Sequence, residues 1–398
     1  MNNGIIMTAE AVDERGRLWK TDPAGIPENE KTTAVEDPRL IPGGFKYCGA
    51  ASKNSFKRAA AAVSDRLMKH AMGPHHFCPR FFKFTGSPFA VTLKTYKDGR
   101  IISEKEHHII SRETAAARQI VGKEEGFSGS YYEAEQARPG RPAVLLIGGS
   151  MGGTYWSELA AARLASEGFS SLAVSYFSYR GEKGLPRILA GIDIEVFERA
   201  LNWLASRNPG SPLSVAGLSK GAEAALVLAS VSERAAGQIE SLTAFSPPSH
   251  LFEGAYLGRA KGLGSWKYGG SILPFLPYPA DARFSAFMKP GYLLDLHSRA
   301  LDKAARQSQN DAKIRAGGIQ ARLLLISGGR DLTWPSGRMC EILKEKNPGA
   351  IWKHYPEAGH IFSPEGIPPC LESATQNLAD NAEAAAGAWR EFTRFLKN

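Results

Sequence analysis

One serine in a glycine-flanked turn is the feature of this sequence that points most directly to chemistry. Ser219 stands in the motif G-L-S-K-G at 217–221, between the apolar run 213–216 and the helix-forming run 222–230. This context is typical of a nucleophile elbow, a sharp turn that presents a serine hydroxyl to an imidazole base. The motif also occurs by chance in ordinary strand-to-helix turns, where the serine only caps the helix. Ser219 is therefore a candidate nucleophile, and its assignment depends on its partners.

The expected partners follow later in the chain, in the order acid and then histidine. The apolar run 321–326 predicts a buried strand that leads to Asp331, and the run 350–355 predicts a second strand that leads to His360. We expect Asp331 to orient the His360 ring, and His360 to take the Ser219 proton and return it to the leaving group. Taken singly, Asp331 could cap the next helix and His360 could be an ordinary loop histidine. Their order and spacing favour the joint interpretation.

A glycine-rich turn at 148–153 could stabilise the negative charge that forms when a carbonyl is attacked. It follows the apolar strand 143–147 and precedes a predicted helix, so its amides can face the elbow. We expect the backbone N–H groups of Ser150 and Lys220 to bind the oxyanion. The turn matches neither the P-loop nor the dinucleotide fingerprint, and a flexible loop is the remaining alternative. No histidine stands in a metal-ligating pattern, so we expect neither a metal nor another cofactor.

The order of the predicted elements indicates an α/β fold with a doubly wound, mostly parallel sheet. The expected strands lie near 143–147, 171–177, 212–216, 240–245, 321–326 and 350–355, and the expected helices near 156–167, 190–206, 220–231, 336–346 and 382–396. The segment at about 247–318 is longer than a connection requires and is rich in glycine, proline and aromatic residues. It predicts an acyl-binding lid, in which we expect Trp266 and Tyr268 to contact substrate.

Several stretches resemble the carboxyl-terminal domain of acyl-CoA thioesterases and bile acid-CoA:amino acid N-acyltransferases, a family related to dienelactone hydrolases. They lie at 149–153, 164–169, 173–177, 217–223, 324–328, 334–336 and 355–360. The resemblance runs from about residue 88 to the end. It implies an α/β-hydrolase domain with Ser219, Asp331 and His360 as nucleophile, acid and base. Thioesterases of the family carry serine and the conjugating enzymes typically cysteine, so Ser219 favours hydrolysis. Relatives often have two successive acidic residues where this chain has Arg330-Asp331.

The resemblance also implies an immunoglobulin-like β-sandwich ahead of the hydrolase domain, which we expect to be kept only in part. The runs 91–96, 107–110 and 126–132 look like its later strands, whereas 55–69 has the apolar spacing of a helix. We therefore expect an extended or partly disordered arm over 1–44, a small N-terminal domain over 45–140 and the catalytic domain over 141–398.

Composition and charge fit a soluble enzyme with an anionic substrate. The 398 residues are 43% hydrophobic and 22% charged, and no apolar run is long enough to span a membrane. The net charge of +9 comes from dispersed basic residues without a nucleic-acid motif, so we expect no nucleic-acid partner. Arg180 and Lys183 are expected to contact CoA phosphates. Four cysteines without close pairing and no secretory signal predict a cytoplasmic protein.

Together these patterns predict a serine hydrolase that cleaves an activated acyl group, most simply an acyl-CoA thioester, through an acyl-Ser219 intermediate resolved by water. The alternatives are an acyltransferase that passes the acyl group to an amine or alcohol, and a catalytically silent binding protein. The complete set of serine, aspartate and histidine disfavours the last. The choice between water and an acceptor depends on how the lid excludes water. The oligomeric state is left open.

Overall fold

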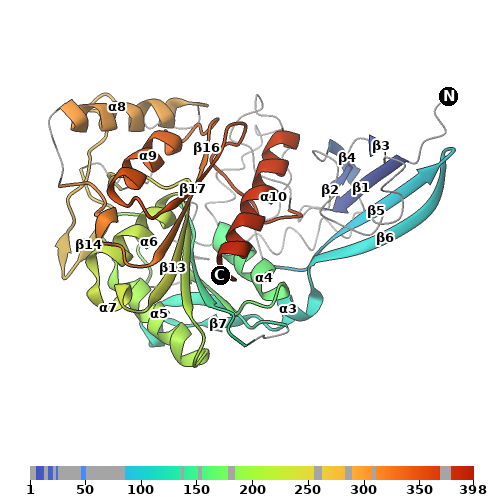
Figure 1. Cartoon of the computed structure of the whole chain (residues 1–398), viewed down its shortest axis with the longest axis horizontal. Helices are drawn as coiled ribbons and strands as arrows, with labels where there is room; N and C mark the ends of the chain where they lie inside the picture. Colours follow the sequence, from blue (N-terminus) through green and yellow to red (C-terminus); the bar gives the residue numbers. More distant parts are fainter. Residues whose placement is uncertain are drawn as a thin grey trace.

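The computed structural model describes residues 6–12, 17–20, 24–25, 46–50, 86–135, 139–150, 155–177, 184–254, 262–282, 289–306, 311–367 and 378–398. Figure 1 shows a layered part built on a large sheet, with a small antiparallel sheet at the other end of the molecule. Among the helices within these ranges, none is long and apolar enough to cross a membrane.

The large sheet has eight strands in the order β7-β8-β10-β9-β12-β13-β16-β17. They are β7 (Gln119–Val121), β8 (Ser128–Tyr132), β9 (Ala143–Ile147), β10 (Ser171–Ser175), β12 (Leu213–Leu218), β13 (Ile239–Phe245), β16 (Arg322–Gly328) and β17 (Ile351–Tyr355). The strands from β10 to β17 in this order pair in parallel, and β8 pairs antiparallel to both of its neighbours. All six strands expected from the sequence are present. The fold class, an α/β hydrolase with a mostly parallel sheet, is confirmed.

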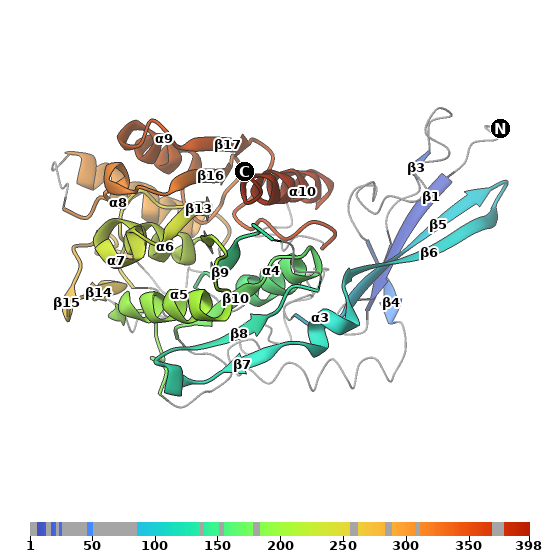
Figure 2. The same ribbon diagram turned by 60° about the horizontal axis from the view of Figure 1, so that its bottom comes forward.

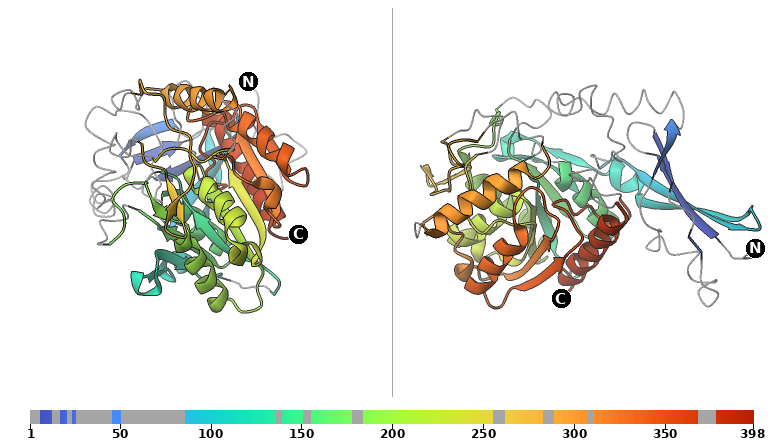
Figure 3. Two further views of the ribbon diagram at one scale, coloured as in Figure 1. Left: turned by 90° about the vertical axis from the view of Figure 1, so that its left-hand side faces the viewer. Right: turned by 90° about the horizontal axis from the view of Figure 1, so that it is seen from above.

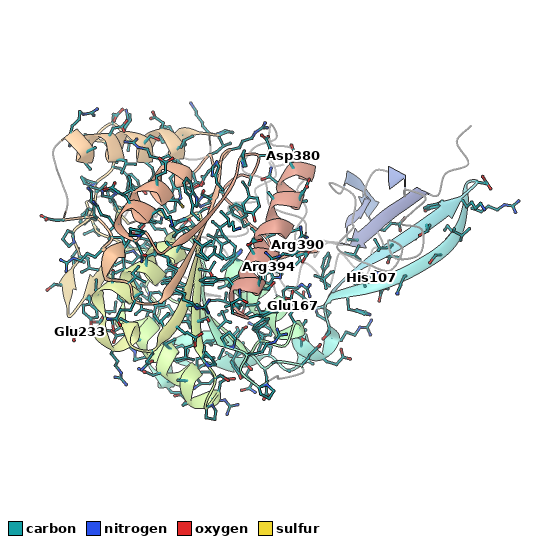
Figure 4. All side chains as sticks on the ribbon, in the orientation of Figure 1. His107, Glu167, Glu233, Asp380, Arg390 and Arg394 are labelled. Atoms are coloured by element: carbon teal, nitrogen blue, oxygen red, sulfur yellow. The ribbon has the colours of Figure 1, made fainter. Side chains whose placement is uncertain are left out.

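Helices cover both faces of this sheet, which explains why successive residues of central strands such as β9 and β10 are all buried. Successive residues of β9 enter different cores: Val144 and Leu146 pack with α4 and α10, whereas Leu145 and Ile147 pack with α5 and α6. The helices are α3 (Arg112–Ala116), α4 (Tyr155–Ser166), α5 (Glu195–Arg207), α6 (Lys220–Val231), α7 (Glu233–Ala236), α9 (Ser336–Lys346) and α10 (Leu378–Phe395), with the 3-10 turns η3 (Lys123–Glu125) and η5 (Ala316–Gly318). Side chains fill the space between the helices and the sheet (Figure 4).

The expected lid segment contains regular structure that the sequence analysis missed. Helix α8 (Tyr292–Arg306) buries one face, and β14 (Trp266–Tyr268) forms a small sheet with β11 (Ile192–Asp193) and β15 (Ser271–Ile272). Helix α8 lies beside α9, to which Arg338 and Asp302 link it through an ion pair of 2.6 Å (Figures 1 and 3). This ion pair joins the expected lid segment to a helix that packs on the large sheet.

The N-terminal part contains an antiparallel sheet that the sequence analysis did not describe. Its six antiparallel strands form one sheet of order β4-β2-β1-β5-β6 with β3 on β1. They are β1 (Ile6–Val12), β2 (Arg17–Lys20), β3 (Ala24–Gly25), β4 (Lys46–Ala50), β5 (Phe89–Lys97) and β6 (Arg100–Ile110). The expected arm over 1–44 thus supplies three strands, and β1 pairs with the distant β5. The β5–β6 hairpin extends away from the large sheet (Figure 2), and His107 lies on it (Figure 4).

The structure corrects the expected position of 126–132, which we predicted to be a late strand of the β-sandwich. Strand β8 pairs instead with β10 in the large sheet, in the register Leu172↔Tyr131. A short strand pattern identifies a strand but not its partner, because pairing depends on distant residues. The large sheet accordingly begins at Gln119, ahead of the expected start near residue 141. The helix expected over 55–69 lies outside the described residues.

Candidate active site

Ser219 lies on a strained turn between β12 and α6. Its backbone has φ 59° and ψ −123°, a left-handed conformation that is uncommon for a residue other than glycine. Its N–H donates to Phe245 O at 2.9 Å and its carbonyl accepts from Glu223 N at 3.0 Å. The flanking glycine is required by space, because a Cβ at Gly221 would collide with the carbonyl oxygen of Ile147. The turn has the backbone geometry of the expected elbow.

The structure brings Asp331 and His360 together at the carboxyl end of the same sheet. His360 Nδ1 lies 2.9 Å from Asp331 Oδ2, and both side chains are buried. The other carboxylate oxygen, Oδ1, accepts from the backbone N–H groups of Thr333 at 2.9 Å and Trp334 at 3.0 Å. These two bonds fix the carboxylate so that Oδ2 faces the imidazole.

Two glycines at the end of β16 allow the histidine loop to approach the acid loop. A Cβ at Gly328 would collide with the carbonyl oxygens of Ala358 and Gly359. Beyond it, Gly329 N donates to Tyr355 O at 2.9 Å and Arg330 N donates to Ala358 O at 2.8 Å. Arg330 stands where relatives often have an acidic residue. Its guanidinium forms an ion pair with Glu357.

Replacing Gly328 by alanine is expected to lower the free energy of unfolding by about 1–3 kcal/mol, because the new Cβ must push the histidine loop away from β16. Urea unfolding at neutral pH measures the change. The matched control is Gly318→Ala, because a Cβ at Gly318 meets no atom within 4 Å. Equal stability of the two variants would contradict the inferred close packing of the two loops.

Ser246, which the sequence analysis did not single out, bonds to β16, to the loop that contains Asp331 and to the loop that contains His360. It has φ 43° and lies directly after β13. Its hydroxyl donates to His360 O at 2.8 Å, its N–H donates to Ile326 O at 2.7 Å, and its carbonyl accepts from Trp334 Nε1 at 3.0 Å. The Trp334 ring in turn meets the His360 ring edge to face, with centroids 5.2 Å apart. These contacts hold the backbone of His360 and one face of its ring.

The glycine-rich turn lies directly beside Ser219. A Cβ placed on Gly149 would lie 3.2 Å from Ser219 Cβ and 3.7 Å from its hydroxyl oxygen. The Tyr176 hydroxyl lies 2.7 Å from Gly148 O and 3.2 Å from Gly149 O. Lys220 is the first residue of α6, so its N–H belongs to the amides that a helix leaves without an intrahelical acceptor. The expected oxyanion donors, Ser150 N–H and Lys220 N–H, thus belong to backbone segments that meet at Ser219.

The Lys220 side chain is buried in a polar network behind the elbow. Its ammonium donates to Glu223 Oε1 at 3.1 Å, to Ser265 Oγ at 2.8 Å and to Phe252 O at 3.2 Å. Glu223 Oε1 also accepts from Trp266 Nε1 at 2.8 Å. Burial lowers the pKa of Lys220 and raises the pKa of Glu223. Three acceptors match the three ammonium protons, so the network ties α6 to the lid segment.

His297 of α8, also missed by the sequence analysis, supports the acid loop. Its Nδ1 lies 2.8 Å from Leu293 O and 2.9 Å from Thr333 O, and its Nε2 lies 3.3 Å from the Tyr278 hydroxyl. Because both neighbours of Nδ1 are carbonyl oxygens, Nδ1 carries the proton and Nε2 accepts. Its ring also contacts Trp334 at 5.2 Å between centroids. Burial lowers the pKa of His297 to about 4.

This low pKa predicts a loss of stability in weak acid. The folded chain keeps His297 neutral, whereas the unfolded chain protonates it below about pH 6.5, so stability falls as the pH drops from 6.5 towards 4. Between pH 7 and pH 5, His297→Gln should reduce the pH-dependent loss in unfolding free energy by roughly 2 kcal/mol. Urea unfolding of both proteins at the two pH values measures this difference. An unchanged pH dependence in the variant would contradict the buried neutral imidazole.

The expected substrate contacts fall in different places. Trp266 is fully buried and holds Glu223, and Tyr268 packs against the core on the α6 side of the sheet. Their contact with substrate stays a prediction. Arg180 and Lys183 lie outside the described residues. Within the described ranges, no three His, Cys, Asp or Glu side chains gather so as to hold a metal ion.

The strand order of the mostly parallel sheet, with helices on both faces, gives this chain the fold of the α/β hydrolases. The model of the family described as BAAT / acyl-CoA thioester hydrolase C terminal matches residues 192–398, more than half of the chain. The chain belongs to this family, and the resemblance seen in the sequence is confirmed.

Similar proteins carry names from two activities. The chain is 29% identical over 276 residues to a human bile acid-CoA:amino acid N-acyltransferase, covering 64% of this chain and 59% of the relative. It is 26% identical over 278 residues to human acyl-coenzyme A thioesterase 1, with the same two coverages. A rat acyl-coenzyme A amino acid N-acyltransferase 2 is 33% identical over 235 residues, covering 52% of each chain. The chain thus spans a little over half the length of these curated relatives.

Among solved structures, a Klebsiella pneumoniae protein assigned to the dienelactone hydrolases has a TM-score of 0.43 and 16% identity, covering 68% of this chain and 92% of that chain. A Pyrococcus furiosus esterase has a TM-score of 0.37 and 18% identity, covering 59% and 79%.

Proposed function

We propose that this chain cleaves acyl-CoA thioesters by nucleophilic catalysis at Ser219. The observation that carries the proposal is the buried 2.9 Å contact between His360 Nδ1 and Asp331 Oδ2, at the sheet edge where Ser219 occupies its strained turn. An imidazole held through Nδ1 presents Nε2 as the base, which is the arrangement that activates a serine hydroxyl. Family membership supplies the thioester class of substrate.

In the proposed first step, His360 Nε2 takes the Ser219 proton while Oγ attacks the thioester carbonyl carbon. The carbonyl oxygen becomes an oxyanion, which the N–H groups of Ser150 and Lys220 stabilise. When the tetrahedral intermediate collapses, the carbon–sulfur bond breaks and the proton on His360 passes to the departing CoA thiolate. Asp331 stabilises the imidazolium that exists between these two transfers.

In the second step, water attacks the acyl-Ser219 ester with His360 again as the base. The carbon–Oγ bond breaks, the proton returns to Oγ, and a free carboxylic acid leaves. An amine that occupies the position of this water would give an amide instead. The N-acyltransferase names of two relatives favour this transfer reaction as the second candidate. Contacts of Arg180 and Lys183 with CoA phosphates and a cytoplasmic location stay predictions.

The test offers the purified full chain a panel of acyl-CoAs of graded chain length, together with aryl esters, with and without amino acid acceptors. Free thiol and product mass are followed in each reaction. Thiol release and free acid without an acceptor are the expected result. Release that occurs only with an acceptor, with amide as the product, would replace hydrolysis by transfer. Inactivity on every thioester, with cleavage of aryl esters, would contradict the thioester assignment.

A further inference from the structure

We infer that Tyr176 is a positioning residue that aims the Ser150 amide at the oxyanion. This inference rests on the proposed function, because it concerns the anion hole of that reaction. Tyr176 follows β10 directly and is 1% exposed. It is not in the proposed proton-transfer chain, and its hydroxyl group bonds to the glycine turn.

The first step of the argument is the convergence of two carbonyl groups on one hydroxyl. Gly148 O lies 2.7 Å and Gly149 O lies 3.2 Å from the Tyr176 oxygen. Two carbonyl oxygens directed at the same point repel each other unless a donor lies between them. The tyrosine supplies that donor, and it remains protonated because burial and the neighbouring Glu223 raise its pKa well above the ordinary value.

The second step follows from the planar peptide group. In a trans peptide the C=O and the following N–H point in opposite directions. The Gly149 carbonyl and the Ser150 N–H belong to one such group. With Gly149 O turned towards Tyr176, the Ser150 N–H is turned away from it. Gly149 itself lies against Ser219, since a Cβ there would be 3.2 Å from Ser219 Cβ.

The third step is the rigidity of the tyrosine itself. Its ring packs against Phe177, Phe197 and Trp266, with centroids 5.0, 5.3 and 5.7 Å away. Trp266 also donates to Glu223, which holds the Lys220 ammonium. One buried cluster therefore supports both sides of the anion hole: the Ser150 side through the Tyr176 hydroxyl, and the Lys220 side through the first turn of α6.

The test variant is Tyr176→Phe, which keeps the ring packing and removes one oxygen. We expect kcat to fall by roughly ten- to hundredfold with KM nearly unchanged, because the oxyanion exists only in the transition state. The matched control is Tyr131→Phe. Tyr131 is a buried tyrosine on β8 whose hydroxyl donates at 3.3 Å to Asn208 Oδ1, which directly follows α5. This variant should keep kcat within about twofold of the unaltered chain.

A second readout separates positioning from a general loss of structure. A trifluoromethyl ketone analogue of the best acyl-CoA forms a tetrahedral adduct with serine, whereas a thioether analogue cannot be attacked. In Tyr176→Phe, affinity for the ketone should fall by the same factor as kcat/KM, and affinity for the thioether should change by less than about twofold. Equal weakening of both analogues, or activity equal to that of Tyr131→Phe, would overturn the inference.

These outcomes are distinct from failure of the proposed function. Full activity of Ser219→Ala, or an unaltered chain that turns over no acyl substrate, would overturn the proposed function itself. An inactive Ser219→Ala together with a fully active Tyr176→Phe would overturn only the inference about Tyr176.

Discussion

Replacing Ser219 with alanine is expected to lower kcat for acyl-CoA cleavage by roughly 10⁴-fold or more, without loss of the fold. The side chain is 7% exposed, and the hydrogen bonds that hold the turn use the backbone of Ser219, Phe245 and Glu223. Alanine meets the same left-handed φ as serine, so backbone strain changes little. Steady-state thiol release measures kcat, and binding of the unreactive thioether analogue shows whether the site is intact.

The matched control for this substitution is Ser214→Ala, which removes a buried serine hydroxyl from β12, the strand that precedes Ser219. Ser214 Oγ lies 2.7 Å from Ser241 Oγ, so the substitution leaves the Ser241 hydroxyl of β13 without this partner. This variant should lose about 1 kcal/mol of stability but keep its activity. A Ser219→Ala variant as active as Ser214→Ala would contradict the nucleophile assignment.

The catalytic part of the fold could be predicted because its signals are local. The central strands of the large sheet are short buried runs, such as β9 (Ala143–Ile147), and the helices α4, α6 and α9 follow β9, β12 and β16. The positions of Asp331 after β16 and of His360 after β17 also follow from the sequence, because parallel strands end at one edge. Their 2.9 Å contact agrees with that reasoning.

The supporting residues could not be predicted because their roles depend on contacts between distant segments. Tyr176 is an ordinary aromatic residue until its hydroxyl meets two carbonyl groups of the glycine turn. His297 lies on the buried face of α8 with Leu296, Ala300 and Leu301, but its imidazole bonds to the acid loop only in the folded chain. The predicted position of β8 was wrong for the same reason, because β9 and α4 lie between β8 and its partner β10 in the sequence. The hydrogen bond from Trp266 to Glu223 likewise joins two segments that the sequence alone does not place side by side.

Replacing Asp331 with asparagine is expected to lower kcat by about 10³- to 10⁴-fold while keeping the loop intact. In the native chain, Oδ1 accepts from the amides of Thr333 and Trp334, and Oδ2 faces His360 Nδ1. Those two amides would select the carbonyl oxygen of asparagine for the Oδ1 position. The amide NH2 group would then face the imidazole and require Nδ1 to accept a hydrogen bond. The proton would move to Nε2, where it blocks the base that Ser219 needs.

The control for Asp331→Asn is Asp302→Asn. Asp302 lies on α8, and the substitution removes its carboxylate charge from an exposed ion pair with Arg338 of α9. This control should retain its activity within about twofold, because exposed ion pairs contribute little to stability. Burst kinetics with an aryl ester separates acylation from deacylation, and both steps should slow in Asp331→Asn because both need an unprotonated Nε2 as the base. If Asp331→Asn retained more than about a tenth of native kcat, tautomer control by Asp331 would be wrong, since a misdirected imidazole proton opposes each proton transfer at Ser219.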